Sequence, residues 1–241
     1  MDYQRYHQLR SNQDTFFGYG LQRRYAKIAE TIEELLPKYE HPIEIADFGC
    51  AEGYMLQQLL DTFEGRINFA HGFDLFKQGV PSHSDKIQLT PVNLFYDYPF
   101  PLADESIDIC YASAFFKHHP KPAKFLAQIN RILKPDGKLL LSDPCSATLR
   151  IGLSVGYFDR NWMPNRWSRK SLAQLLESSP QPLDLTLVEY ERYWIAPSKR
   201  VFDMGIERWL PSALRKTLGL HQLAVLEKRR AHSPEVQPTD A

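Results

Sequence analysis

The strongest chemical signal in this sequence is a glycine-rich stretch between a predicted strand and a predicted helix. β-branched, apolar residues from Ile43 lead into Asp47 and then a turn that ends at Gly53, after which leucines recur at helical spacing. This order predicts a buried strand, a tight turn and a helix N-terminus. Glycine allows close backbone approach to a ligand, and a helix start directs free N–H groups and positive partial charge at it. The stretch therefore predicts a nucleotide-type cofactor site.

The spacing within this turn separates the cofactor classes. A dinucleotide fingerprint has the form G-x-G-x-x-G, whereas this chain has Ala51 and Tyr54 where the second and third glycines would stand after Gly49. A phosphate-binding P-loop ends in Gly-Lys-Ser/Thr, which is absent here. Asp74 is a candidate for binding the ribose of such a cofactor, and it ends a second predicted strand that covers 67–74. It lies roughly 20 residues past the turn, where a carboxylate can accept hydrogen bonds from both ribose hydroxyls.

Taken together, four segments resemble the class I S-adenosylmethionine-dependent methyltransferases, in particular the methyltransferase type 11-like domain. Residues 47–53 resemble its D-x-G-C-G-x-G motif, with Ala51 in place of the middle glycine, and Asp74 ends the following strand. Residues 98–112 resemble the family's "LPF…D-x-S-F-D-x-V" passage, and residues 129–141 resemble "R-V-L-K-P-G-G-x-L". The resemblance covers about residues 43–143.

This resemblance implies S-adenosyl-L-methionine as the cofactor, and it implies which residues surround it. Asn93 stands where many relatives have aspartate, and its side-chain oxygen can still accept a hydrogen bond. The cofactor-binding residues expected from the resemblance are Asp47, Gly49, Cys50, Ala51, Glu52, Gly53, Asp74, Leu75, Asn93, Leu94, Ala112 and Ser113.

The acceptor side of the site is less clearly marked. His118 and His119 follow the fourth predicted strand, and histidine is the commonest general base near neutral pH. We expect His118 to be the catalytic residue of the two, against the alternative that both histidines are structural. The segment 144–170 is a lid-like insertion that interleaves arginines with aromatic residues, and from it we expect Arg160, Trp162 and Trp167 to bind the substrate. The alternatives are a surface for RNA or lipid headgroups, or a solvated loop whose aromatic residues pack onto the core.

These residues need a scaffold, and the pattern of elements supplies one. Strand and helix patterns alternate to about residue 143, which predicts an α/β, doubly wound Rossmann-like sheet. The family resemblance implies seven strands, mostly parallel, with one antiparallel strand near the edge. We expect a single domain over 1–230 with an N-terminal helical cap over 1–40, a helix from Gln22 to Leu36 within it, a turn at 135–137, a helical segment over 201–218, and a disordered tail over 231–241.

Composition narrows the function classes. Lysine plus arginine and aspartate plus glutamate are 29 each, so a global electrostatic footprint for nucleic acid is absent and no nucleic-acid partner is expected. No apolar run is long enough for a membrane span, and the N-terminus lacks an apolar signal region. The three cysteines, Cys50, Cys110 and Cys145, lack metal-ligand spacing, so no metal is expected, and they suit reduced thiols in a cytoplasmic protein.

The sequence thus favours methyl transfer to a small-molecule acceptor, which can be lipid- or sugar-linked. Two alternatives stay open: an RNA or protein methyltransferase, and a non-catalytic methyltransferase-like domain that binds the cofactor or a partner. The acceptor atom and the oligomeric state are not marked by any residue pattern.

Overall fold

The computed structural model describes residues 16–75, 84–146, 163–193, 204, 209–211, 214 and 219–230. Its elements, in chain order, are α2 (Phe16–Leu35), the 3-10 helix η1 (Leu36–Lys38), β1 (Ile43–Phe48), α3 (Tyr54–Thr62), β2 (Ile67–Asp74), β3 (Ile87–Pro91), β4 (Ile107–Ser113), the 3-10 helix η2 (Phe116–His118), α4 (Pro122–Ile132), β5 (Leu133–Pro144), α6 (Arg169–Glu177), β6 (Leu185–Tyr193) and β7 (His221–Lys228).

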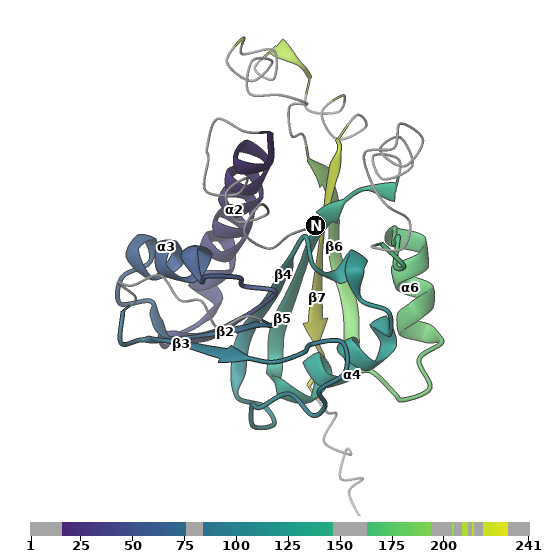
Figure 1. The fold of residues 1–241 in the computed structure, drawn as a ribbon, viewed down its shortest axis with the longest axis horizontal. Helices are drawn as coiled ribbons and strands as arrows, with labels where there is room; N and C mark the ends of the chain where they lie inside the picture. Colours follow the sequence, from purple (N-terminus) through teal and green to yellow (C-terminus); the bar gives the residue numbers. More distant parts are fainter. Residues whose placement is uncertain are drawn as a thin grey trace, which may run out of the picture.

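The strands form one seven-stranded sheet in the order β3-β2-β1-β4-β5-β7-β6 (Figure 1). Strands β1 to β5 pair in parallel, whereas β7 runs antiparallel to both of its neighbours, β5 and β6. The predicted fold class is therefore confirmed, including the single antiparallel strand next to the edge. Because β7 is reversed, its first residue lies at the same edge of the sheet as the carboxyl ends of the parallel strands.

This topology concentrates potential ligand contacts at one edge. From β1 the chain first builds outward through β2 and β3, and then returns to place β4 on the other side of β1. In open α/β sheets, ligands bind outside the carboxyl ends of the strands at such a switch point. The turn after β1, the end of β2 and the residues after β4 all lie at this edge.

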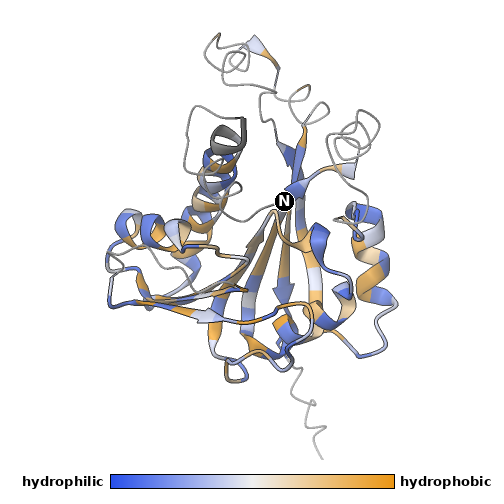
Figure 2. Ribbon diagram, in the orientation of Figure 1, coloured by the Kyte–Doolittle hydropathy of each residue, from blue (hydrophilic) through white to orange (hydrophobic). Residues whose placement is uncertain are grey.

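Helices cover both faces of the sheet, and each face has its own core. One core joins α2 and α3 to inward residues such as Ile45, Ile109 and Leu140, whereas the other joins α4 and α6 to Phe48, Cys110 and Leu141. Alternate residues of each strand thus enter opposite cores, as the two-residue repeat of a strand requires. Figure 2 shows the central strands as mostly hydrophobic, which is typical of a sheet buried on both faces.

Two predicted boundaries differ from the structure. Helix α2 begins at Phe16 rather than at Gln22, because residues before the amphipathic repeat also adopt helical geometry. The expected turn at 135–137 lies within β5, which begins directly after α4. Its pairing shifts from Ile107↔Leu133 to Ile109↔Lys138, and Asp136 has a φ of +65°, so the turn residues form an irregularity in the strand instead of a connection.

Other expectations lie outside the described residues. These are the disordered tail over 231–241, most of the helical segment over 201–218, the first part of the N-terminal cap and residues 147–162 of the lid-like insertion. Within the described part of the chain, none of the helices combines the length and apolar character that crossing a membrane requires.

Candidate functional site

The turn after β1 adopts left-handed backbone geometry at three positions. Gly49 has a φ of +90°, Ala51 of +49° and Gly53 of +77°. Glycine adopts this geometry without steric cost, whereas alanine is strained there. Ala51, which departs from the family motif, therefore keeps the backbone shape that a glycine would give.

The amide groups of this turn are mostly satisfied within the protein, which differs from the expectation of free N–H groups. Gly49 and Cys50 both donate to the carbonyl of Phe73, at 2.8 and 3.2 Å. Ala51 donates to a carboxylate oxygen of Asp74 at 2.9 Å. These bonds tie the turn to the end of β2. The start of α3 is the more open part, because its N-cap residue, Gly53, provides no side-chain cap.

Asp74 links the turn to the chain that leaves β2. One of its carboxylate oxygens accepts from Ala51, and the other accepts from the amide of Leu75 at 2.7 Å. A carboxylate has about four acceptor positions, and the described residues use two of them, which leaves two for ligand hydroxyls. Leu75 itself is 53% exposed, and Tyr54 at the start of α3 is 48% exposed, so apolar surface flanks this carboxylate. An acid with free acceptor positions beside exposed apolar side chains suits a ribose and a purine ring.

Asp47 and the end of β4 complete this part of the site. Asp47 is nearly buried and lies in register with Tyr111 of β4. Burial and the negative charge of Asp47 hold the pKa of Tyr111 well above its usual range, so the phenol stays protonated. Ala112 is fully buried, whereas the Ser113 hydroxyl, at the end of β4, is buried without a hydrogen-bond partner among the described residues. Ser113 is the last residue of β4, so this unsatisfied hydroxyl lies at the carboxyl edge that the topology assigns to ligands.

The remaining turn residues have structural features of their own. Burial raises the pKa of the Cys50 thiol far above its usual value, so this cysteine is no thiolate nucleophile. Glu52 is also buried. At Gly49, an added Cβ would lie only 2.7 Å from the ring of Phe115. Gly49 therefore makes room for a protein side chain, rather than for a ligand alone.

Asn93 and Leu94 form a compact turn after β3. The Asn93 side-chain oxygen accepts from the amide of Phe95 at 3.2 Å, and its backbone carbonyl accepts from Asp97 at 2.8 Å. The oxygen that could accept from a cofactor is thus already used once. Leu94 is buried, and its carbonyl accepts from His119.

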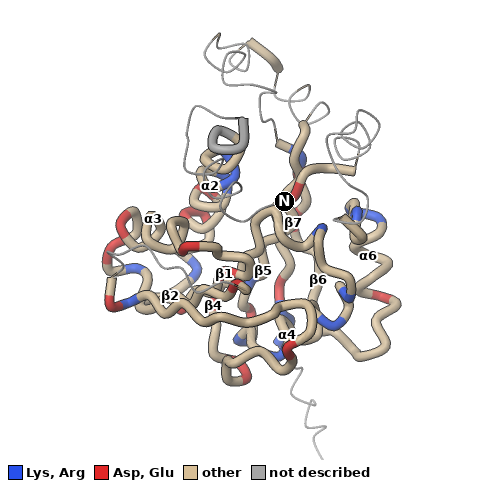
Figure 3. Tube along the Cα trace, in the orientation of Figure 1, with Lys and Arg blue, Asp and Glu red and all other residues tan. Residues whose placement is uncertain are grey.

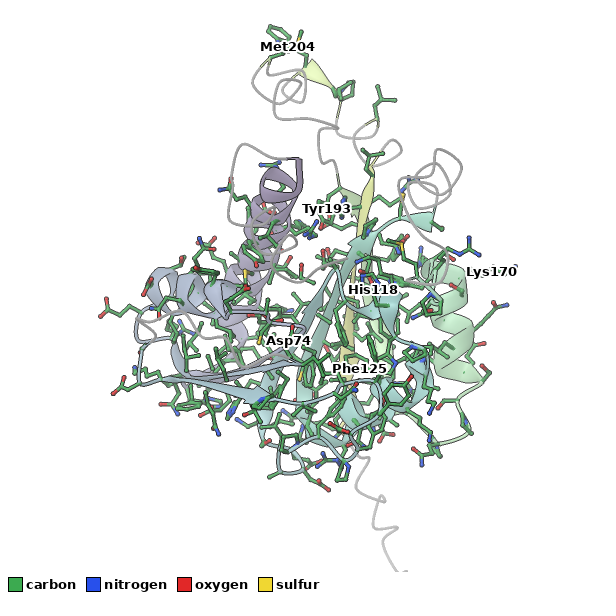
Figure 4. All side chains as sticks on the ribbon, in the orientation of Figure 1. Asp74, His118, Phe125, Lys170, Tyr193 and Met204 are labelled. Atoms are coloured by element: carbon green, nitrogen blue, oxygen red, sulfur yellow. The ribbon has the colours of Figure 1, made fainter. Side chains whose placement is uncertain are left out.

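The two adjacent histidines differ in their surroundings. His119 is fully buried, its Nδ1 accepts from the amide of Lys121 at 3.1 Å, and its Nε2 lies 3.0 Å from the Leu94 carbonyl. This pattern assigns the proton to Nε2, and burial lowers the pKa of His119 to about 4. His119 is therefore a neutral structural residue. His118 ends η2, is half-buried, and lies at the carboxyl edge near the central strand ends (Figure 4).

A buried ion pair beside these histidines was missed by the sequence reasoning. Lys117 is 5% exposed and Asp143, near the end of β5, is 0% exposed. The Lys117 Nζ lies 3.4 Å from Asp143, and its amide donates to the same carboxylate at 3.0 Å. Burial lowers the pKa of Lys117 to about 8, although Asp143 opposes this shift. The only sequence signal was a lysine that directly follows two phenylalanines after β4.

The three substrate-binding candidates have different outcomes. Arg160 and Trp162 lie outside the described residues. Trp167 is 2% exposed and donates from Nε1 to Asp143 at 2.8 Å. Its ring packs against Phe116 and Tyr190. In the described structure Trp167 thus supports Asp143 from the core, and direct contact with an acceptor stays a prediction.

No group of three or more histidine, cysteine, aspartate or glutamate side chains in the described ranges could hold a metal ion. The three cysteines, which belong to β1–α3, β4 and the end of β5, are free thiols.

Comparison with known proteins adds short similarities to curated enzymes. The chain is 35% identical over 66 residues to a dimethylglycine N-methyltransferase of Parasynechococcus marenigrum, covering 27% of this chain and 24% of that protein. It is 27% identical over 110 residues to malonyl-[acyl-carrier protein] O-methyltransferase 1 of Coxiella burnetii, covering 46% of this chain and 36% of that protein. The chain therefore spans only about a quarter to a third of the length of these relatives.

The fold is shared with solved structures. The protein bound to the Trm112 methyltransferase activator of Haloferax volcanii superimposes with a TM-score of 0.62 at 18% identity, over 88% of this chain and 93% of that one. An S-adenosylmethionine-dependent methyltransferase of Mesorhizobium loti superimposes with a TM-score of 0.54 at 13% identity, over 78% and 91%. The family model described as a methyltransferase domain matches residues 19–179, which is more than half of the 241 residues and includes β1 to α6. This chain therefore belongs to the methyltransferase domain family.

Proposed function

We propose that this protein transfers a methyl group from S-adenosyl-L-methionine to a small-molecule acceptor at the carboxyl edge of the sheet. The observation that carries the proposal is the link between the Gly49–Gly53 turn and Asp74, which presents open carboxylate positions beside exposed apolar side chains. The family and fold imply this cofactor as well.

The residues around the turn fit the cofactor's parts. Asp74 would accept from the ribose hydroxyls, and Leu75 would cover one face of the adenine. The uncapped start of α3 and Asp47 would face the methionine end, with Ala112 and Ser113 beneath it. When bound, S-adenosylmethionine supplies an activated methyl group for in-line displacement. The protein's part is to align the acceptor and to exclude water.

The acceptor is the finer part of the proposal. Equal numbers of basic and acidic side chains disfavour a nucleic-acid acceptor. The names of the two curated relatives mention dimethylglycine and a malonyl group on an acyl-carrier protein, so similar domains act on small groups both free and carried by a protein. A small group, in either form, is the acceptor that we propose.

A general base is available if the acceptor is an oxygen or nitrogen nucleophile. His118 is half-buried at the carboxyl edge, whereas His119 has its protonation state fixed by Leu94 and Lys121. We therefore propose His118 as the base and His119 as its structural neighbour.

Calorimetry with S-adenosylmethionine tests the cofactor site. The Asp74→Ala variant should bind about 10- to 150-fold more weakly, because hydrogen bonds to a charged group contribute about 1.5–3 kcal/mol. Asp61→Ala, which removes an exposed carboxylate near the end of α3, is the matched control. Unchanged affinity in a folded Asp74→Ala protein would remove the ribose assignment.

Turnover is tested by the release of S-adenosylhomocysteine across a panel of free and carrier-linked small metabolites. His118→Asn should lower kcat by about 10²- to 10⁴-fold without changing cofactor affinity, as expected for a general base. His119→Asn should instead lower the melting temperature. Loss of folding in both variants, without a specific effect on kcat, would instead support a structural role for both histidines.

A further inference from the structure

A second group of polar side chains lies at the same edge of the sheet, beyond the cofactor turn. It consists of Arg24 from α2, Lys117 after β4 and His221 at the start of β7, and we call it the basic cluster. Figure 3 shows basic residues on α2 and near the strand ends beside it. Lys27, one helical turn after Arg24, pairs with Glu191 of β6 at 2.6 Å, and the end of β6 pairs with the start of β7, where His221 lies. Burial and the positive charges of Arg24 and Lys117 hold the pKa of His221 well below its usual range. The ion pair and the strand pairing therefore bring the three groups to one end of the sheet.

The cluster contains nitrogen atoms that lack partners. His221 is 8% exposed, and its Nδ1 is buried without a hydrogen-bond partner among the described residues. The Nε of Arg24 is also buried without a hydrogen-bond partner, and Arg24 makes no ion pair within the described part of the chain. Buried polar atoms are nearly always satisfied, so these two nitrogens at the same end of the sheet are available to hydrogen-bond a ligand.

The negative charge nearby is already used. Asp143 is fully buried, with its oxygens engaged by Lys117 and by Trp167 Nε1 at 2.8 Å. Glu191 of β6 pairs with Lys27 at 2.6 Å. Among the described residues, the two cations of the cluster, Arg24 and Lys117, thus have one buried carboxylate beside them, that of Asp143, which pairs with Lys117, and the balance of these charges is positive.

The position of the cluster separates it from the cofactor turn. Strand β7 is three places from β1 in the sheet, with β4 and β5 between them. At about 4.8 Å per strand, His221 lies roughly 14 Å along the sheet from the turn. Tyr193, whose ring centroid is 5.7 Å from that of His221, lies between α2 and the ends of the central strands in Figure 4. The cluster is therefore on the side of the sheet opposite to Asp74 and β3.

We infer that the basic cluster binds an anionic group, a carboxylate or a phosphate, of the methyl acceptor. This inference rests on the proposed function, and it adds the chemical class of the acceptor. Arg24 would donate from its guanidinium, His221 from Nδ1–H, and Lys117 would supply charge from beneath. Such charge-assisted bonds, made away from water, hold one end of the acceptor while its nucleophile reaches the cofactor.

The test uses the full chain saturated with S-adenosylhomocysteine. Malonate and inorganic phosphate are titrated by calorimetry as the carboxylate and phosphate probes, with malonamide as the neutral counterpart. At least one anion should bind saturably, and malonamide should not. Arg24→Gln and His221→Phe should each weaken that binding by about tenfold or more, while S-adenosylhomocysteine affinity stays unchanged.

Lys38→Gln is the matched control, because Lys38 is an exposed cation at the opposite edge of the sheet, before β1. His221→Phe retains the ring that packs on Tyr193, and Arg24→Gln changes a half-buried helix position, so one of the two should fold even if the other does not.

The inference would be overturned by the absence of saturable anion binding, by equal binding of malonamide, or by unchanged anion binding in both variants. Competition between the anion and S-adenosylhomocysteine would also overturn it, because the cluster would then hold the carboxylate of the cofactor. Failure of the proposed function would give a different result, because the parent protein would then bind no S-adenosylhomocysteine. Anion titration of the cofactor-free protein would still test the basic cluster in that case.

Discussion

The two ends of the ligand-binding edge are built in different ways. At the β1–β2 end, the expected cofactor-binding groups belong to one stretch, residues 47–75, and are held by backbone geometry and by hydrogen bonds between the turn and the end of β2. At the β5–β7 end, Arg24, Lys117, Asp143 and His221 come from four separate parts of the chain and are held by burial and charge. One end is local in sequence, and the other exists only after folding.

This difference has an energetic consequence. The turn and Asp74 satisfy one another, so within the described residues the β1–β2 end keeps open the carboxylate positions and the uncapped start of α3. The β5–β7 end keeps unpaired nitrogens and a buried ion pair, which is stable only while each charge keeps its partner. Loss of the Asp74 carboxylate at the first end should therefore affect mainly binding, whereas substitutions in the buried groups of the second end should affect both folding and binding.

The largest effect should come from breaking the buried pair. Lys117→Met removes the partner of the fully buried Asp143 and should lower the free energy of unfolding by about 3–5 kcal/mol, measured by urea denaturation. Lys38→Met, an exposed change, should stay within about 0.5 kcal/mol of the parent. The double variant Lys117→Met/Asp143→Leu should recover part of the loss. A single variant as stable as the parent would mean that this end is not held by charge.

The next largest effect concerns acid pH. The pKa of His119 is lowered to about 4 in the folded protein, so between pH 6.5 and 4 the unfolded chain binds more protons than the folded one. The neutral His119 therefore contributes about 2–4 kcal/mol to the free energy of unfolding above pH 6.5, and this contribution is lost as the pH falls toward 4. Denaturation curves of the parent and of His119→Gln should therefore converge in this range.

His41→Gln, which alters an exposed histidine before β1, provides the comparison and should follow the parent at every pH. Parallel curves for the parent and His119→Gln would show that His119 carries no linked proton.

A smaller effect separates packing from binding at the cofactor end. Gly49→Ala places a Cβ 2.7 Å from the Phe115 ring at a φ of +90°, so it should lower stability by about 1–3 kcal/mol. Gly49→Ala/Phe115→Leu should regain stability, because a smaller side chain then faces the new methyl group. If thermal denaturation shows no loss in the single variant, the ring moves freely and Gly49 is not a packing residue.

The smallest effect should come from restoring the family's glycine. Ala51→Gly relieves left-handed strain but adds freedom to the unfolded chain, so the two terms nearly cancel at about 0–1 kcal/mol of added stability. Cofactor affinity, measured by calorimetry, should be unchanged because the Ala51 amide already bonds Asp74. Markedly tighter binding by the glycine variant would show that the alanine methyl group obstructs the cofactor.

The sequence determined the first end of the edge because its signals are local. The strand, the turn and the second strand end are each predicted by the residues that form them. These are the β-branched run before Asp47, the glycines at Gly49 and Gly53, and the acid at the end of β2. The same local logic predicted the doubly wound sheet, while the family resemblance supplied the antiparallel strand. At 135–137 the predicted turn residues lie inside β5, where residues 134–137 have no partner on β4 and Asp136 has a φ of +65°, so the local turn preference persists within the strand.

Only the tertiary structure decided the second end. Nothing near Arg24 or His221 in the sequence marks them, since their shared field arises when α2 and β7 reach the same edge of the sheet. Likewise, Trp167, which was predicted to contact the substrate, is buried against Asp143. This contact arises because the start of α6 lies close to the end of β5 in the folded protein, although the two are far apart along the chain. Burial and long-range charge are properties of the folded molecule, whereas turn geometry is a property of neighbouring residues.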